Sequence, residues 1–197
     1  KNKFDFIGVS AVVSTAYAYT KYIINLIKLK QPNAIVFVGG NLAASSEVVL
    51  RYTKADFCMI GDGEVIIENL IPKLKKDGLS KKLLSTVKGL SFIDEDNNLK
   101  FTGYEHPLPA PLLETPDWTI LEKENSLDHY IGKNLSNFEF FIGKTEKNSK
   151  KATIVVAKGC VARCTFCHRF EKGYRVQPNE KVLEHIKFLK KNIQLHI

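Results

Sequence analysis

Residues 34–40 read AIVFVGG, a continuous apolar run that ends in two glycines. A short run of this kind, rich in Val and Ile, is typical of a strand that is buried on both faces, as in a parallel sheet. Similar apolar runs at residues 4–10 and 57–60 predict two further strands. These three strands form the expected centre of the fold.

The segments between these strands have helical periodicity. Apolar residues recur at intervals of three and four between residues 19 and 27, and Pro32 then ends the helix. A short helix is expected at residues 46–53 and a third at residues 64–74. Because strands and helices alternate, the sequence predicts an α/β fold with a Rossmann-like parallel sheet.

A polar turn and a proline-rich stretch follow this region. Residues 89–93 and 99–101 flank the polar sequence DEDNN and are expected to form a β-hairpin. Residues 104–150 contain four prolines and are mostly polar, which predicts a linker. Beyond the linker, residues 152–157 predict a strand and residues 180–191 a helix. We therefore predict an α/β domain with its hairpin at residues 1–103, a linker at 104–150 and the start of a second domain at 151–197.

The composition limits the classes of partner. The chain has 197 residues and a formal net charge of +8, but its lysines are scattered with glutamates between them. Such charge is typical of a solvated surface, so no nucleic-acid partner is expected. No apolar run approaches the ~18 residues that a membrane span needs, and no signal peptide opens the chain. A cytoplasmic location is expected, and both ends suggest a fragment of a longer protein.

Three of the four cysteines lie within the eight residues CVARCTFC, at Cys160, Cys164 and Cys167. Thiolates are soft metal ligands, and three on one short loop can converge on a single metal centre. A zinc site is the alternative, but it would need His168 as its fourth ligand, beside a cysteine that binds the same ion. Cys58 stands alone in a predicted buried strand and is expected to belong to the core.

The spacing C-x3-C-x2-C, with the aromatic Phe166 before the third cysteine, resembles the signature of the radical S-adenosylmethionine (SAM) superfamily. The resemblance implies that the three cysteines bind three irons of a [4Fe–4S] cluster, whose fourth iron binds SAM. It also implies that Phe166 lies near the adenine of SAM and that a flavodoxin or ferredoxin donates electrons. Three of the four arginines lie close by in the sequence, where they would tune the cluster, meet the carboxylate of SAM or simply be exposed: Arg163, Arg169 and Arg175.

Small and hydroxyl residues follow each of the first three predicted strands. The sequences are SAVVST at residues 10–15, GGN at residues 39–41 and GDGE at residues 61–64. The carboxyl ends of parallel strands share one edge of a sheet, so these loops predict a ligand site there. Together they resemble the cobalamin-binding domain that precedes the radical core in class B radical SAM enzymes. The resemblance implies cobalamin contacts from Ser10, Ala11, Val12, Ser14, Gly39, Gly40, Asn41, Gly61, Asp62, Gly63 and Glu64.

The resemblance implies an overall reading of the chain. It predicts a cobalamin-binding Rossmann-like sheet, a linker and the first β/α unit of a truncated partial (β/α) barrel. The implied activity is reductive cleavage of SAM for methyl transfer, with the fragment itself inactive and no catalytic residue or substrate assigned. Alternatives are a radical SAM cyclase or rearrangement enzyme, a tRNA-thiolating type and a non-catalytic metal- or cobalamin-binding module. The thiolating type would need further cysteines in the first half, which has only Cys58.

Overall fold

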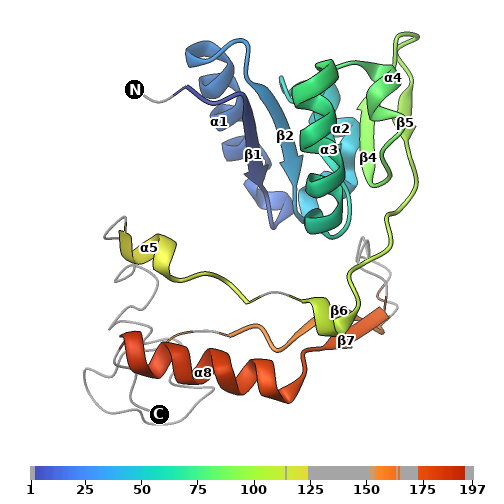
Figure 1. The fold of residues 1–197 in the computed structure, drawn as a ribbon. Coiled ribbons are helices and arrows are strands. Elements are labelled where there is room, and N and C mark those ends of the chain that lie inside the picture. Colours follow the sequence, from blue (N-terminus) through green and yellow to red (C-terminus); the bar gives the residue numbers. More distant parts are fainter. Residues whose placement is uncertain are drawn as a thin grey trace. The chain divides into compact units, whose positions relative to one another are not determined.

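The computed structural model describes residues 3–113, 115–123, 152, 154–162, 164 and 173–193 (Figure 1). The chain divides into two compact units. The first unit comprises Lys1–Leu108 with Cys160–Gly173, and the second comprises Pro109–Gly159 with Tyr174–Ile197.

A five-stranded sheet forms the centre of the first unit, with its strands in the order β1-β2-β3-β4-β5. The strands are β1 (Phe6–Ser10), β2 (Ile35–Gly39), β3 (Phe57–Met59), β4 (Leu90–Ile93) and β5 (Leu99–Phe101). Strands β1, β2 and β3 are parallel to one another, as predicted. The predicted hairpin is also present as β4 and β5, but it extends the same sheet in the antiparallel sense. The sheet is therefore Rossmann-like but mixed, not purely parallel.

The antiparallel addition follows from where β4 begins. The Ile60 N–H, just after β3, donates to the Gly89 carbonyl oxygen at 2.8 Å, just before β4. Gly89 has a φ of +80°, and a Cβ there would lie 2.3 Å from the Ile66 side chain. The chain therefore turns at Gly89 beside the end of β3, and β4 runs back along it. Residues with a Cβ rarely adopt this backbone, so the turn depends on glycine.

Helices cover both faces of the sheet because side chains alternate along its strands. In β2, Val36 and Val38 belong to the core shared with α1 (Tyr17–Lys30) and α2 (Ser46–Tyr52). On the opposite face, Ile35 and Phe37 pack against the core of α3 (Gly63–Asp77) and α4 (Lys81–Leu84). Short 3-10 turns lie at Ser14–Ala16, Asn41–Ser45 and Ala110–Leu112.

A partly buried ion pair joins α1 to the sheet at the edge where β2 begins. Lys28 Nζ donates to Asp56 Oδ2 at 2.7 Å and to the Ala34 carbonyl oxygen at 2.8 Å. The same Asp56 oxygen accepts from the Val36 N–H at 2.7 Å. One carboxylate thus links the end of α1, the start of β2 and the loop before β3.

The second unit contains α5 (Thr119–Lys123), most of β6 (Ala157–Cys160) and β7 (Gly173–Val176), and α8 (Asn179–Ile193). Strands β6 and β7 form a two-stranded sheet. Leu189 of α8 is buried against Trp118, Ala152 and Ile154. Of the helices within the described ranges, none has the length and apolar character needed to cross a membrane.

The predicted helix at residues 180–191 is confirmed as α8, but the strand predicted at residues 152–157 is wrong. The strand begins only at Ala157 and includes Gly159 and Cys160. Val155 and Val156 are each 45% exposed, and the Val156 carbonyl oxygen accepts from the Gln177 N–H, just past the end of β7. The apolar run is longer than the stretch for which β7 provides a partner, so only its end is a strand. The barrel remains a prediction.

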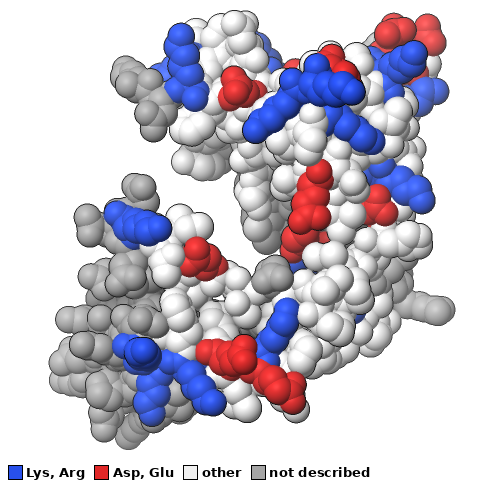
Figure 2. Space-filling view, in the orientation of Figure 1, with Lys and Arg blue, Asp and Glu red and all other residues white. Residues whose placement is uncertain are grey.

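Charged side chains of both signs are interspersed on the face drawn in Figure 2. The structure also has an ion pair between Arg51 and Glu47, one helical turn apart on α2, at 3.0 Å. Arg51 also donates to the side chain and carbonyl oxygen of Asn97 in the β4–β5 turn. Surface arginine here supports local structure, in keeping with the solvated charge expected from the sequence.

Candidate functional site

The loops that follow β1 and β2 are joined backbone to backbone. The Ala11 N–H donates to the Gly39 carbonyl oxygen at 2.9 Å, and the Leu42 N–H donates to the Ala11 carbonyl oxygen at 3.0 Å. Ala11 itself is buried, with 2% of its surface exposed. Both polar groups of one residue are therefore used to align the two loops.

Gly40 makes this approach possible. Its φ is +80°, and a Cβ at this position would lie 2.6 Å from the Ala11 carbonyl oxygen. A side chain would therefore be strained by the backbone and would collide with a backbone atom that cannot move aside. By contrast, a Cβ at the neighbouring Gly39 would meet no atom within 4 Å. Of the glycine pair, Gly40 serves the fold, whereas Gly39 leaves open space above the end of β2.

The loop after β3 is also open. Gly61 has a φ of +110°, and a Cβ there would meet nothing within 4 Å. Asp62 follows in extended conformation and precedes the first turn of α3, which starts at Gly63. Glu64, in that first turn, is exposed. The first N–H groups of a helix lack partners within the helix, so this end of α3 presents donors.

Strand register places the predicted ligand residues on one edge of the sheet. Ser10 pairs with Gly39 across β1 and β2, and Val38 pairs with Cys58 across β2 and β3. The arrowheads of β1 and β2 in Figure 1 mark this edge. We call it the glycine rim; its residues are Ser10, Ala11, Val12, Ser14, Gly39, Gly40, Asn41, Gly61, Asp62, Gly63 and Glu64.

The glycine rim exposes both polar and apolar side chains. Ser10, Ser14 and Asn41 are exposed. Val12 is 62% exposed although it is apolar. Exposed apolar surface beside hydroxyl and amide groups, next to glycines that leave the backbone bare, suits a large ligand with both apolar and polar parts. The rim fits a group of cobalamin's kind, because a Cβ at Gly39 or Gly61 would fill the space that such a group would need.

The cysteine segment begins at the end of β6. Cys160 and Cys164 are both exposed, with free thiols. The Ala162 N–H donates to Cys160 Sγ at 3.4 Å. Backbone N–H groups aimed at sulfur are among the features that stabilise cluster-bound thiolates, so these two residues fit a metal–sulfur site. Cys167 and Phe166 lie outside the described residues, as do Arg163, His168 and Arg169.

Cys58 is a core residue, as predicted. It lies in β3 with no exposed surface. Burial raises the pKa of its thiol to about 12, because the thiolate would lose its hydration. A thiol of this kind stays protonated and is a poor metal ligand. Arg175, the one described member of the arginine group, is half-buried in β7.

Residues 1–71 match a family model described as the B12 binding domain. We refer to these 71 residues as the B12-binding domain, after the family model that they match. This domain ends within α3 and so contains the whole glycine rim. The match confirms the resemblance to a cobalamin-binding domain that the loop sequences suggested.

Beyond the B12-binding domain, three known proteins resemble most of the chain. The anaerobic magnesium-protoporphyrin IX monomethyl ester cyclase of Rubrivivax gelatinosus is 25% identical over 191 residues, covering 95% of this chain and 31% of the cyclase. The cobalamin-dependent S-adenosylmethionine radical enzyme OxsB, solved with aqua-cobalamin and S-adenosylmethionine, matches with a TM-score of 0.64 and 23% identity, covering 97% of this chain and 24% of OxsB. The radical S-adenosylmethionine methyltransferase TsrM of Kitasatospora setae matches with a TM-score of 0.58 and 15% identity, covering 95% of this chain and 35% of TsrM. The two solved structures share the fold, and the chain spans about a third or less of each relative's length.

Sequence reasoning missed one arrangement outside the B12-binding domain. Trp118 Nε1 donates to His185 Nε2 at 2.9 Å, within the second unit. Trp118 lies in the proline-rich stretch that the sequence predicts to be a linker. The lone tryptophan of the chain and the histidine on the α8 stripe were the available signals, but nothing in the sequence pairs them.

Proposed function

We propose that the chain is part of a cobalamin-dependent radical SAM enzyme that binds cobalamin at the glycine rim and a [4Fe–4S] cluster at the cysteine segment. The observation that carries the proposal is the close approach of Gly40 to Ala11, which joins two loops of the B12-binding domain into one exposed surface. The order of B12-binding domain, linker and C-x3-C-x2-C motif supports it.

The residues of the rim have separate tasks in this proposal. Gly39 and Gly61 leave room for the ring system to approach the backbone, while Ser10 and Ser14 offer hydroxyl groups to its polar side chains. Val12 provides an apolar contact at the same edge. The chemistry that cobalamin supplies to such an enzyme is the transfer of a methyl group.

The cysteine segment has the complementary task. Cys160, Cys164 and Cys167 would bind three irons, and Phe166 would pack against the adenine of SAM. The chemistry that a cluster supplies here is the single electron for reductive cleavage of SAM, received from a donor such as a flavodoxin or ferredoxin. Three protein ligands leave one coordination position open, as in catalytic metal sites that bind a substrate directly.

Methyl transfer is the reaction that we propose, in the cytoplasm and on a substrate bound outside the described residues. A second candidate is a cyclisation, which the likeness to the Rubrivivax gelatinosus cyclase favours. The two differ in product: the first adds the mass of one methylene to the substrate, whereas ring closure adds no carbon. Mass spectrometry of the product therefore distinguishes them.

Anaerobic reconstitution of the full-length protein tests both cofactors at once. We expect ~4 iron atoms per chain, as three cysteine ligands and an open position imply, together with the absorption bands of bound cobalamin. Cys164→Ala is expected to lose iron and keep cobalamin, and Gly39→Val to lose cobalamin and keep iron. Gly78→Val is the control, because its Cβ also meets no atom within 4 Å and its positive φ, of +71°, adds backbone strain, but Gly78 ends α3 away from the rim.

Two results would overturn parts of this proposal. A colourless protein with stoichiometric zinc would rule out the cluster. Iron without cobalamin, in a protein whose B12-binding domain is folded, would rule out the role of the glycine rim alone.

A further inference from the structure

Strand β1 forms an open edge of the five-stranded sheet (Figure 1). It pairs with β2 on one side, and among the residues that the structure describes no strand pairs with it on the other. Asp5 and Ala11 turn main-chain groups toward β2, because the carbonyl oxygen of Asp5 accepts from β2 and the N–H of Ala11 donates to it. Successive residues of a strand direct these groups to opposite sides, so three alternate residues direct theirs to the open edge: Phe6, Gly8 and Ser10.

The two edges of this sheet differ in how they are protected. Strand β5, at the other edge, has only three residues, and its middle residue Lys100 pairs with Asp94 at 3.4 Å. Strand β1 has five residues, FIGVS, with neither a charged residue nor a proline, and its register with β2 is regular throughout. Native proteins shorten, charge or bend their edge strands, because an unprotected edge pairs with any free strand. Strand β1 therefore has the features of an inner strand.

Aromatic side chains beside this edge are incompletely covered on the α3 face of the sheet. Phe37 of β2 stacks on the buried Phe57, with ring centroids 5.3 Å apart, but is itself only half-buried. A Cβ at Gly8 would lie 2.8 Å from Phe37 Cε2, so this ring extends over the bare backbone of β1. Phe6 is also half-buried on the same face. The apolar layer of this face therefore reaches the edge strand without full cover.

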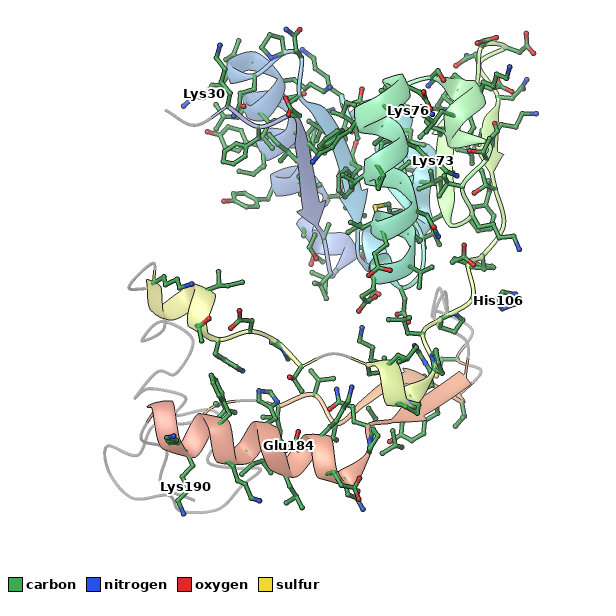
Figure 3. The ribbon with its side chains drawn as sticks, in the orientation of Figure 1. Lys30, Lys73, Lys76, His106, Glu184 and Lys190 are labelled. Carbon is green, nitrogen blue, oxygen red and sulfur yellow. The ribbon has the colours of Figure 1, made fainter. Side chains whose placement is uncertain are left out.

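The opposite face has apolar side chains beside the edge as well. Figure 3 draws the side chains of α1 and labels its last residue, Lys30. Lys28 of this helix reaches Asp56, in the loop before β3, and so marks the side of α1 that faces the middle of the sheet. Tyr19 lies about two and a half turns before Lys28, on the reverse side of the helix. Tyr19 is 68% exposed, and Ile23, one turn further along that side, is half-buried. Apolar side chains therefore flank the open edge on both faces.

We propose that the edge of β1 is filled by a β-strand from another part of the same protein, and that the segments joined to this strand cover Phe6, Phe37 and Tyr19. An extended backbone is the partner that matches a row of main-chain donors and acceptors. A parallel sheet is covered on both faces, which accounts for the apolar side chains above and below the edge. The strand completes the first unit whether or not the glycine rim binds cobalamin.

The same protein is the source that best fits this edge. A regular, uncharged edge pairs with strands of other molecules unless it is permanently filled. A strand of the same protein fills it at a high effective concentration, without any need for a second molecule. The relatives contain enough chain for such a strand, since this chain covers only 31% of the cyclase and 24% of OxsB.

Hydrogen exchange of the full-length protein tests for the strand. Mass spectrometry with fragmentation to single residues should find the Phe6, Gly8 and Ser10 amides protected at least ~100-fold relative to an unstructured peptide, as for amides inside a sheet. The Ile7 and Val9 amides face β2 and are the internal reference for protection in the same strand. Slow exchange at those two amides with fast exchange at the other three would show an open edge and overturn the proposal.

Repeating the exchange over a range of protein concentrations identifies the source of the strand. Protection that stays constant in a protein with the mass of one chain, as measured by light scattering, supports a strand of the same protein. Protection that falls in step with the dimer fraction on dilution would assign the edge to a second copy, and would overturn the proposed source.

Two tyrosines test whether the side of α1 beside the edge is covered. Tyr19 and Tyr52 are 68% and 61% exposed, and as the same residue type they have the same intrinsic reactivity. Tyr52 is the matched control, because it ends α2, which packs over β3 and β4. Hydroxyl-radical footprinting of the full-length protein should oxidise Tyr19 several-fold more slowly than Tyr52. Equal oxidation of the two would contradict the cover over α1.

Discussion

Trp118 and His185 are separated by 67 residues in the sequence, yet the indole N–H donates to the imidazole Nε2 at 2.9 Å. Their ring centroids lie 6.5 Å apart. The hydrogen bond holds the segment before α5 against α8, and Leu189 adds an apolar contact to Trp118 from the next turn of the helix. A neutral imidazole is required, because only an unprotonated Nε2 can accept.

The first prediction is that acid weakens this contact. Burial lowers the pKa of His185 below the ordinary value of a histidine, since the charged ring would be poorly hydrated. The unfolded chain therefore binds a proton before the folded chain does, and stability is lost as the pH falls through about 6.5 and below. The thermal unfolding temperature, followed by the fluorescence of the chain's single tryptophan, should fall between pH 7.5 and pH 5.5.

His185→Gln is the control for this pH dependence. The glutamine carbonyl oxygen can accept from the indole but does not titrate, so its unfolding temperature should change less over the same interval. An identical pH dependence in the two proteins would show that other groups are responsible.

The second prediction separates the two glycines at the end of β2. Gly40→Ala should lower the free energy of unfolding by roughly 2–4 kcal/mol, because it combines a left-handed backbone with a backbone collision. Gly39→Ala should leave that free energy almost unchanged, since its Cβ enters open space. Urea denaturation measures both. If cobalamin occupies the glycine rim, Gly39→Ala should nevertheless bind it more weakly, as judged by absorption titration.

The third prediction concerns the ion pair at the opposite edge of the sheet. Asp56→Ala removes the carboxylate that accepts from both Lys28 Nζ and the Val36 N–H, and leaves Lys28 only the Ala34 carbonyl oxygen; the Lys28 and Asp56 side chains are only 15% and 23% exposed. We expect a loss of about 1–3 kcal/mol in urea denaturation. Asp56→Asn keeps an acceptor for both donors and should lose less. A loss in Asp56→Ala as small as that in Asp56→Asn would mean that the shared oxygen contributes little.

The fourth prediction is a difference in thiol reactivity. Iodoacetamide at pH 8 should modify Cys160 and Cys164 in the folded apo-protein, because both are exposed. Cys58 should react only after unfolding, since it is buried and its pKa of about 12 leaves almost no thiolate. Peptide mass spectrometry reads out each site. Early modification of Cys58 would contradict its place in the core, and reconstitution with iron should protect the two exposed cysteines.

Local periodicity was sufficient to predict β1, β2, β3 and the three helices beside them, with ends that differ by a few residues. An apolar run predicts a strand but does not show which neighbouring strand it pairs with. The strand predicted at residues 152–157 therefore included apolar residues before Ala157, where the strand begins. The hairpin could be predicted from its polar turn. Its pairing with β3 depends on the positive φ of Gly89, and the presence of a glycine in the sequence does not by itself predict that conformation. The rim residues were found because strand ends meet at one edge. Trp118 and His185 were not, because no local pattern links residues so far apart.

The exposed side chains around the Ala11–Gly40 contact are not needed to hold the two loops together. Because main-chain hydrogen bonds and the buried Ala11 and Leu42 align the two loops, the exposed Val12, Ser14 and Asn41 can be exchanged with little risk to the sheet. Evolution, or a protein engineer, could therefore retune what this surface holds through those three positions while the scaffold beneath them stays the same. If the glycine rim binds cobalamin, a small library randomised there, in a background that keeps Gly40, is a practical starting point for binding altered corrinoids.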